Sequence, residues 1–272
     1  MNGGELAGRA AIVPGGAGGI GSAVCRELAG RGAAVVVADL DLEQARAVAA
    51  ALPGAGHDAV AVDVTDGAAV RAAVQGAAAA RERIDLLVYC AGNNIKAPSL
   101  ELSAAQWRSA LDSHLTGAFL FSQAVGRHLV ARGSGGRMVY VSSVGAWAPI
   151  PERGAYSPSK AALNSLAGML AVEWARYGIN VNTVCPGVAA TAMTTLVYSR
   201  DPALRSARRK RMPIPREVYP EEIAALVAFL CGPGGDYING AAIPIDGGFL
   251  QSGFMPEPNL EADPGQRPPD RD

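Results

Sequence analysis

The sequence contains few cysteines and no long apolar segment, and both features exclude whole classes of protein. Its four cysteines are far apart and match neither the spacing of a zinc site nor a disulfide framework. No segment approaches the roughly 18 consecutive apolar residues of a membrane-spanning helix. The N-terminal MNGGELAGRA lacks the charged and apolar regions of a signal peptide. We therefore expect a cytoplasmic protein with no metal site, no disulfide and no membrane association.

The charges are nearly balanced, with 24 basic and 25 acidic residues and a formal net charge of -1. This balance provides no extended basic surface, so nucleic acid is not an expected partner. The local exception is RSARRKR, residues 205–211. We interpret this segment first as a solvated helix face and, alternatively, as a clamp for an anionic substrate or a cofactor phosphate.

Short β-branched segments alternate with longer helical patterns rich in alanine and leucine. Strands that are apolar on both faces are typical of a parallel sheet covered by helices on both sides. We predict an α/β fold in which residues 1–254 form a single domain, with a doubly wound seven-stranded parallel sheet and helices on both faces. The predicted strands are 10–13, 34–38, 59–62, 85–89, 137–141, 179–184 and 241–245.

The composition changes at about Met255. The segment PEPNLEADPGQRPPDRD has many prolines and little apolar surface to bury. We therefore expect residues 255–272 to be a disordered tail or a segment that contacts a partner subunit.

A glycine-rich turn follows the first predicted strand. Its glycines fit two registers, GxxxGxG at Gly15, Gly19 and Gly21, or GxGxxG at Gly16, Gly18 and Gly21. In either register the turn is tight and the backbone is open to close approach, so a pyrophosphate can lie at the N-terminus of the following helix. A glycine-rich turn without a ligand is the alternative.

Acidic residues follow the second and third predicted strands. Asp39 comes 18 residues after Gly21, where a dinucleotide-binding fold has an acid that accepts hydrogen bonds from ribose hydroxyls. A carboxylate there repels a 2′-phosphate, so NAD is expected in preference to NADP. The alternative is a solvated acid at a strand end. Asp63 and Val64 are candidates to hold the adenine, and a helix cap is the alternative for Asp63.

The segment YSPSK places a phenol and an ammonium four residues apart. In the first turns of a helix, Tyr156 and Lys160 lie one above the other. We expect the cation to lower the pKa of Tyr156 and make it a usable acid/base near neutral pH. Ser143 ends a predicted strand at the ligand-binding edge of the sheet, and its hydroxyl can hydrogen-bond a substrate oxygen. An ordinary amphipathic helix with a partly buried lysine is the alternative.

Together these motifs resemble the short-chain dehydrogenase/reductase family over Leu6 to about Phe254. The resemblance implies a Rossmann fold in which Tyr156 is the general acid/base, Lys160 also binds the nicotinamide ribose and Ser143 orients the substrate. It also implies homotetramers or homodimers formed through the helices before and after the active-site strand, and a substrate-covering segment at about 191–215. The implied cofactor-binding residues are Gly15, Gly19, Ile20, Gly21, Asp39, Asp63, Val64, Ala91, Gly92, Tyr156, Lys160, Pro186, Gly187, Val188 and Thr191.

Three positions depart from the family pattern. His114 stands where the family has a catalytic asparagine that supports a water-linked proton relay. Histidine also donates and accepts, so His114 either carries the relay, with its own pH dependence, or only fills the place. Pro14 and Cys90 replace a threonine and an asparagine that are mainly structural in the family. We expect cofactor binding to persist with altered affinity.

The first functional hypothesis is an NAD(H)-dependent dehydrogenase or ketoreductase acting on a secondary alcohol or ketone. AGNNIKAPSLELSAAQW and INGAAIPIDGGF resemble family members that oxidise sugars, polyols and hydroxy acids, such as gluconate 5-dehydrogenase-like enzymes. Two alternatives stay open: a cofactor-binding protein with a regulatory or structural role and no turnover, and a non-redox biosynthetic enzyme on the same fold. Trp147 is interpreted equally well as a substrate contact or as a residue that packs in the core or in an interface. The candidate substrate contacts are Asn94, Lys96, Trp147 and Arg153.

Overall fold

A seven-stranded parallel sheet forms the centre of the molecule. The computed structural model describes residues 4–254, and the strands lie in the order β3-β2-β1-β4-β5-β6-β7. The chain changes direction across the sheet between β1 and β4, which is the doubly wound arrangement, and such sheets bind ligands at the carboxyl ends of these strands. The strands are β1 (Ala10–Pro14), β2 (Ala34–Asp39), β3 (Asp58–Ala61), β4 (Leu86–Tyr89), β5 (Gly136–Val141), β6 (Ile179–Pro186) and β7 (Ala242–Ile245).

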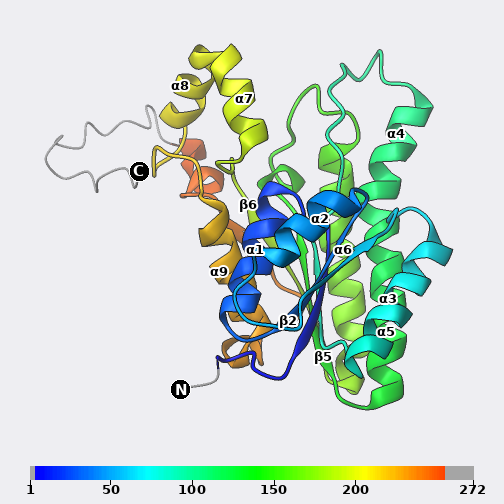
Figure 1. Ribbon diagram of the computed structural model, residues 1–272. Helices are drawn as coiled ribbons and strands as arrows, with labels where there is room; N and C mark the ends of the chain where they lie inside the picture. Colours follow the sequence, from blue (N-terminus) through cyan, green and yellow to red (C-terminus); the bar gives the residue numbers. More distant parts are fainter. Residues whose placement is uncertain (1–3, 255–272) are drawn as a thin grey trace, which may run out of the picture.

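Helices cover both faces of the sheet (Figure 1). The α-helices are α1 (Gly19–Gly30), α2 (Leu42–Ala50), α3 (Gly67–Arg81), α4 (Ala104–Leu111), α5 (Gly117–Arg132), α6 (Tyr156–Trp174), α7 (Ala192–Arg200), α8 (Pro202–Lys210) and α9 (Pro220–Cys231). Buried side chains of α3, α5 and α6 form one apolar cluster with the sheet, and those of α1, α2 and α9 form the other. This is a single-domain Rossmann fold, as the sequence predicted.

The strands are apolar because each face of the sheet is buried under helices. All residues of β1 and β4 are buried. Successive side chains point to opposite faces, so Ile12 belongs to one apolar cluster and Val13 to the other. The predicted strands agree with the observed ones to within two residues at each end. The alternation of buried strands and helices was therefore sufficient to locate the sheet.

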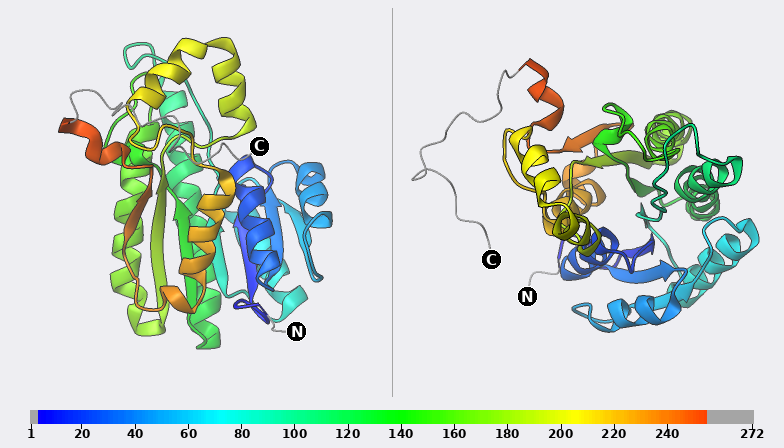
Figure 2. Two further views of the ribbon diagram at one scale, coloured as in Figure 1. Left: turned by 90° about the vertical axis from the view of Figure 1, so that its left-hand side faces the viewer. Right: turned by 90° about the horizontal axis from the view of Figure 1, so that it is seen from above.

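The helices α7 and α8 lie above the carboxyl edge of the sheet (Figure 2). The basic segment belongs to α8, where Arg205 and Arg209 pair with Glu217 at 3.1 and 2.7 Å. Burial acts to raise the pKa of Glu217, but the hydrogen bonds from the two arginines outweigh it and lower the pKa to about 2. Arg205 and Arg209 thus anchor α8 to a buried carboxylate, while their side chains stay 49% and 33% exposed.

The sequence also predicted that the chain has no membrane-spanning helix, no metal site and no disulfide. Among residues 4–254, no helix combines the length and apolarity needed to cross a membrane. The same part of the chain has no group of three or more His, Cys, Asp or Glu side chains suited to a metal ion. All four cysteines are free thiols. The predicted tail, 255–272, lies outside the described residues.

Candidate active site

The glycine-rich turn joins β1 to α1 at the carboxyl edge of the sheet. Gly15 has a φ of 75°, and a Cβ there would lie 2.5 Å from the backbone nitrogen of Ala91. A Cβ at Gly21 would overlap the carbonyl oxygen of Gly15. Close backbone approach therefore requires glycine at both positions, and it brings Ala91, at the end of β4, against the turn.

The other glycines of the turn distinguish the two registers. A Cβ at Gly19 would lie 3.1 Å from Cγ2 of Thr191, whereas one at Gly18 would meet only the Gly15 carbonyl oxygen, at 3.4 Å. Gly16 is also restricted, because a Cβ would lie 2.7 Å from the carbonyl oxygen of Val13. The GxxxGxG register, with Gly15, Gly19 and Gly21, therefore describes the steric requirement better.

The N-terminus of α1 has the properties of an anion site. Gly18 caps it without a side-chain hydrogen bond, and its first turn has no acidic residue. The first N–H groups of a helix and its dipole attract negative charge. A dinucleotide pyrophosphate fits this position, because the glycines leave the backbone uncovered. Ile20, one of the implied contacts, lies in this first turn.

Asp39 ends β2 beside the same turn. Its Oδ2 accepts a hydrogen bond from the Ala17 N–H at 3.0 Å, and its Oδ1 accepts from the Asp41 N–H at 3.4 Å. The side chain is half-buried. The carboxylate is thus held against the glycine-rich turn, which disfavours the alternative of a freely solvated acid and places it where an adenosine ribose would lie in a dinucleotide-binding fold.

Asp63 and Val64 lie in the loop after β3. The Asp63 carboxylate accepts hydrogen bonds from the Thr65 hydroxyl at 2.7 Å and the Thr65 N–H at 2.8 Å, and these bonds lower the pKa of Asp63. The cap of α3 is Asp66, so the interpretation of Asp63 as a helix cap is wrong. Val64 packs against the apolar cluster beneath α3 and α5.

Tyr156 is the first residue of α6, and Lys160 follows one turn later. The Lys160 Nζ lies 5.7 Å from the centroid of the Tyr156 ring and donates a hydrogen bond to the Val141 carbonyl oxygen at 2.8 Å. Burial lowers the pKa of Lys160 to about 8, so the amine is mostly protonated at neutral pH. Ser143, just after β5, lies close enough to Tyr156 to act to lower the pKa of its phenol. The structure therefore brings the three predicted catalytic side chains together.

The pKa of Tyr156 differs from the sequence prediction. Burial raises the pKa, and this exceeds the lowering by the Ser143 hydrogen bond and by the charge of Arg153. The prediction that Lys160 lowers the pKa of Tyr156 is wrong for this arrangement. The ammonium faces the ring and donates to a backbone carbonyl, while loss of solvent disfavours the phenolate. The nearby cation that favours the phenolate is Arg153.

His114 lies in a π-helix, Asp112–Thr116, between α4 and α5. Its side chain is 3% exposed, and its ring meets that of Tyr156 edge to face at 5.4 Å between centroids. Nε2 lies 2.8 Å from the carbonyl oxygen of Asn93. A carbonyl only accepts, so Nε2 carries the proton and the buried Nδ1 is an acceptor without a protein partner among the described residues.

The imidazole is neutral under ordinary conditions. Burial and then the charge of Lys160 lower the pKa of His114 to about 3, against a smaller raising effect of the Asn93 carbonyl. The imidazole therefore does not change its charge near neutral pH. The prediction that His114 gives the proton relay its own pH dependence is wrong in that pH range. A Cβ at Gly92 would overlap the imidazole, so Gly92 provides the space that the ring occupies.

The loop after β6 completes the predicted cofactor-binding set. Pro186 ends the strand, the Gly187 N–H donates to the Ile245 carbonyl at 3.0 Å, and the Val188 carbonyl accepts from the Val218 N–H at 2.9 Å. These bonds fix the loop against β7 and against the segment that precedes α9. Thr191 follows it and lies beside Gly19 of the glycine-rich turn.

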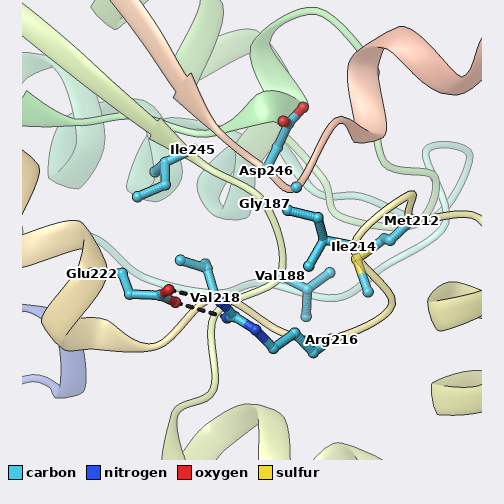
Figure 3. Close-up of a pocket in the computed structure, with 10 residues that line it drawn as sticks. Gly187, Val188, Met212, Ile214, Arg216, Val218, Glu222, Ile245 and Asp246 are labelled. Atoms are coloured by element: carbon cyan, nitrogen blue, oxygen red, sulfur yellow. Dashed lines mark hydrogen bonds and ion pairs between the residues drawn. The ribbon is translucent and has the colours of Figure 1, made fainter. Parts of the chain in front are cut away.

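A cavity of about 110 Å³ lies behind this loop (Figure 3). Gly187, Val188 and Ile245 line it, and Arg216 pairs with Glu222 at 2.7 Å on its opposite side. Neither Tyr156 nor Ser143 lines this cavity. It therefore lies on the rear side of the loop and away from the catalytic side chains.

The structure separates the four candidate substrate contacts into two groups. Arg153 Nη1 donates a hydrogen bond to Asn94 Oδ1 at 2.6 Å, so these two side chains meet. Lys96 is exposed, and Trp147 is 47% exposed, which excludes the interpretation of Trp147 as a core residue of this chain. The hydrogen bond between Arg153 and Asn94 fixes this pair in the loops beside Tyr156.

The unusual Pro14 and Cys90 lie side by side at the strand ends. The Cys90 N–H donates to the Pro14 carbonyl at 2.8 Å, and the Cys90 side chain packs against the apolar cluster under α1 and α9. The backbone contact needs no side-chain partner, so the turn keeps its position in spite of both replacements.

Sequence reasoning missed two residues that shape this region. The Asn93 carbonyl holds the His114 ring, and buried Glu217 anchors α8. A backbone carbonyl leaves no mark in a sequence, and Glu217 lies in a stretch with several other acids. No motif could have identified either residue.

Comparison with known proteins gives matches over most of the chain. A family model described as enoyl-(acyl carrier protein) reductase matches residues 15–250. The chain is 40% identical to D-threitol dehydrogenase of Mycolicibacterium smegmatis over 90% of this chain and 94% of that protein. It is 42% identical to cis-4-hydroxycyclohexanecarboxylate dehydrogenase of Sinomonas cyclohexanicum over 89% and 96% of the two chains. The crystal structure of a gluconate 5-dehydrogenase from Burkholderia cenocepacia, in complex with NADP and tartrate, superimposes with a TM-score of 0.86 at 33% identity, covering 90% of this chain and 96% of that one.

Proposed function

Because this chain belongs to the short-chain dehydrogenase/reductase family, we propose that it interconverts a secondary alcohol and a ketone with NAD(H). It is an oxidoreductase, as the alcohol and polyol dehydrogenases among its relatives are. The observation that carries the proposal is the grouping of Ser143, Tyr156 and Lys160, in which the Lys160 ammonium lies 5.7 Å from the centroid of the Tyr156 ring and Ser143 influences the pKa of the phenol. Binding without turnover is not favoured, because this arrangement is intact, and a non-redox reaction has no specific observation in its support.

Each catalytic side chain has a separate task in this proposal. Ser143 hydrogen-bonds the substrate oxygen and places it near the phenol. Tyr156 accepts the hydroxyl proton during oxidation and returns it during reduction. Lys160 lies beneath the ring, and this position lets its ammonium reach a ribose of the cofactor. A bound nicotinamide supplies hydride acceptance or donation at its C4 carbon.

His114 has the geometry of a relay residue in this mechanism. Its unpartnered Nδ1 can accept a hydrogen bond from a water molecule, while Nε2 stays bound to the Asn93 carbonyl. An asparagine side chain also offers both a donor group and an acceptor. Since asparagine can take over both hydrogen bonds, we expect His114→Asn to raise kcat or to lower it by no more than about threefold. A threefold loss corresponds to less than ~1 kcal/mol of transition-state stabilisation. A large loss in steady-state rates would show that the imidazole itself is required.

The same substitution should reduce the sensitivity of the fold to acid. The pKa of His114 is about 3 in the folded chain against an ordinary value of 6.5. Between these values the unfolded chain binds the additional proton, so the folded chain loses stability as the pH falls through this window. Thermal midpoints at pH 7 and pH 5 should therefore differ less for His114→Asn than for the parent. The control is His57→Asn, because His57 lies at the opposite, amino edge of the sheet.

The preference for NAD over NADP is part of this proposal and rests on Asp39. The relatives do not decide it, because two of the similar solved structures contain NADP. A carboxylate fixed beside the turn by the Ala17 N–H can accept hydrogen bonds from ribose hydroxyls, whereas a 2′-phosphate would meet like charge.

Replacing Asp39 by alanine should relax this preference. We expect the affinity for NADPH relative to NADH to rise about tenfold, equivalent to ~1.4 kcal/mol of removed repulsion. Parallel fluorescence titrations with the two cofactors measure this ratio. Glu43→Ala is the matched control, since Glu43 is a neighbouring acid whose side chain is 83% exposed. An unchanged ratio would remove Asp39 from the discrimination, and a parent protein that binds neither cofactor would overturn the redox function.

We further propose that residues 191–215 cover the bound substrate, because α7 and α8 lie over the carboxyl edge of the sheet (Figure 1).

A homodimer or homotetramer through α5 and α6 is also proposed. Apolar side chains on these helices are exposed in the single chain, with Met169 47% and Val172 82% exposed. A monomeric mass by light scattering would refute the second proposal. The cytoplasmic location stays a prediction from the sequence.

A further inference from the structure

Arg153 lies in the short loop before α6, three residues ahead of Tyr156. Its neighbours Glu152 and Gly154 both have a left-handed backbone, with φ of 57° and 54°. The Tyr156 N–H donates to the Arg153 carbonyl oxygen at 3.0 Å. The turn that begins the catalytic helix therefore also sets the position of this arginine.

A second loop holds Arg153 from the other side. Its backbone forms a parallel bridge with Ala97, the Ala97 N–H donates to the Glu152 carbonyl at 3.1 Å, and its Nη1 donates to Asn94 Oδ1 at 2.6 Å. These contacts join the loop after β4 to the loop before α6. The guanidinium is thus held at a defined place in spite of its partial exposure.

No carboxylate of the described part of the chain neutralises the charge of Arg153. Within residues 4–254 it forms no ion pair with an aspartate or a glutamate, whereas Arg205 and Arg209 of α8 are paired with Glu217. Arg153 also lies close enough to favour the phenolate of Tyr156. The other cation of the site, Lys160, is buried and donates to a carbonyl. Arg153 is therefore the cation that an anionic group beside Tyr156 would meet.

We propose that Arg153 binds a carboxylate of the substrate, so that the natural substrates are hydroxy acids and the corresponding keto acids. This inference rests on the proposed dehydrogenase function and specifies its substrate class. A guanidinium has five N–H donors, and the bond to Asn94 uses one of them. The remaining edge can donate two parallel hydrogen bonds to the two oxygens of a carboxylate. A neutral polyol presents no matching charge.

The test compares an acid with its neutral isostere. The substrates are 4-hydroxycyclohexanecarboxylate and 4-hydroxycyclohexanecarboxamide, oxidised with NAD. We expect the parent to prefer the carboxylate, and Arg153→Gln to lower the ratio of the two kcat/KM values by about 10- to 100-fold, mainly through KM, since hydrogen bonds to charged groups contribute this much. Arg153→Lys should lose less, because it keeps the charge but not the planar fork. Arg108→Gln, which removes an exposed arginine of α4, should leave the ratio unchanged.

A second measurement removes the dependence on turnover. Calorimetric titration of the parent and Arg153→Gln with cyclohexanecarboxylate and cyclohexanecarboxamide should show a preference for the acid that the substitution abolishes. Equal affinities in the parent, or a preference that survives in Arg153→Gln, would overturn the inference. If the parent oxidises the carboxamide as well as the carboxylate, the dehydrogenase function stands and the role of Arg153 is refuted. If Arg153→Gln lowers kcat/KM equally for both substrates, Arg153 acts only through the pKa of Tyr156. That outcome also refutes the proposal that Arg153 binds a carboxylate.

Discussion

Tyr156→Phe should lower kcat by about 10³-fold while the dissociation constant for NADH changes little, because general acid–base catalysis contributes about 10²- to 10⁴-fold. The phenylalanine ring keeps the edge-to-face contact with His114 and the position above Lys160. Only the hydroxyl, whose pKa Ser143 influences, is removed. The change therefore deletes the proton carrier without emptying the site.

The experiment pairs steady-state rates with an NADH fluorescence titration on the same preparation. Tyr177→Phe is the matched control, since Tyr177 is 38% exposed after α6 and its ring lies 4.8 Å from the Arg176 guanidinium carbon. It should behave like the parent in both measurements. Substantial turnover by Tyr156→Phe would refute the acid/base role and would require another proton carrier in the site.

Gly21→Ala should weaken NADH binding by at least about tenfold and destabilise the fold by roughly 1–3 kcal/mol, the usual cost of overpacking. The added methyl group would overlap the Gly15 carbonyl oxygen. Gly15 is itself fixed by a left-handed φ and by its hydrogen bond to the Ala38 carbonyl at 2.8 Å. The turn must therefore shift away from α1, and the N–H groups that would bind a pyrophosphate move with it.

Gly30→Ala provides the control within the same helix. A Cβ at Gly30 meets no atom within 4 Å, and alanine is favoured over glycine in a helix by up to ~1 kcal/mol. This variant should be as stable as the parent or slightly more so, with unchanged NADH affinity. Equal NADH affinity in Gly21→Ala and the parent would show that the turn does not hold the cofactor, whatever the change in thermal midpoint.

The sequence determined the fold and the candidate catalytic side chains. Buried parallel strands must be apolar on both faces, so their positions could be found from composition along the chain. The spacing of Tyr156 and Lys160 and the glycines of the turn are local patterns, which require no knowledge of distant contacts. For this reason the sheet and the side chains around Tyr156 agree with the prediction.

Only the tertiary structure decided the electrostatics of the site. A pKa depends on burial and on charges that arrive from distant segments, so the sequence could not show that burial raises the pKa of Tyr156 or that His114 stays neutral. Nor could it show that Arg153, with no conspicuous motif, meets Asn94 from another loop. Local spacing identifies which residues can react, but the packing of separate loops sets the charge that surrounds them.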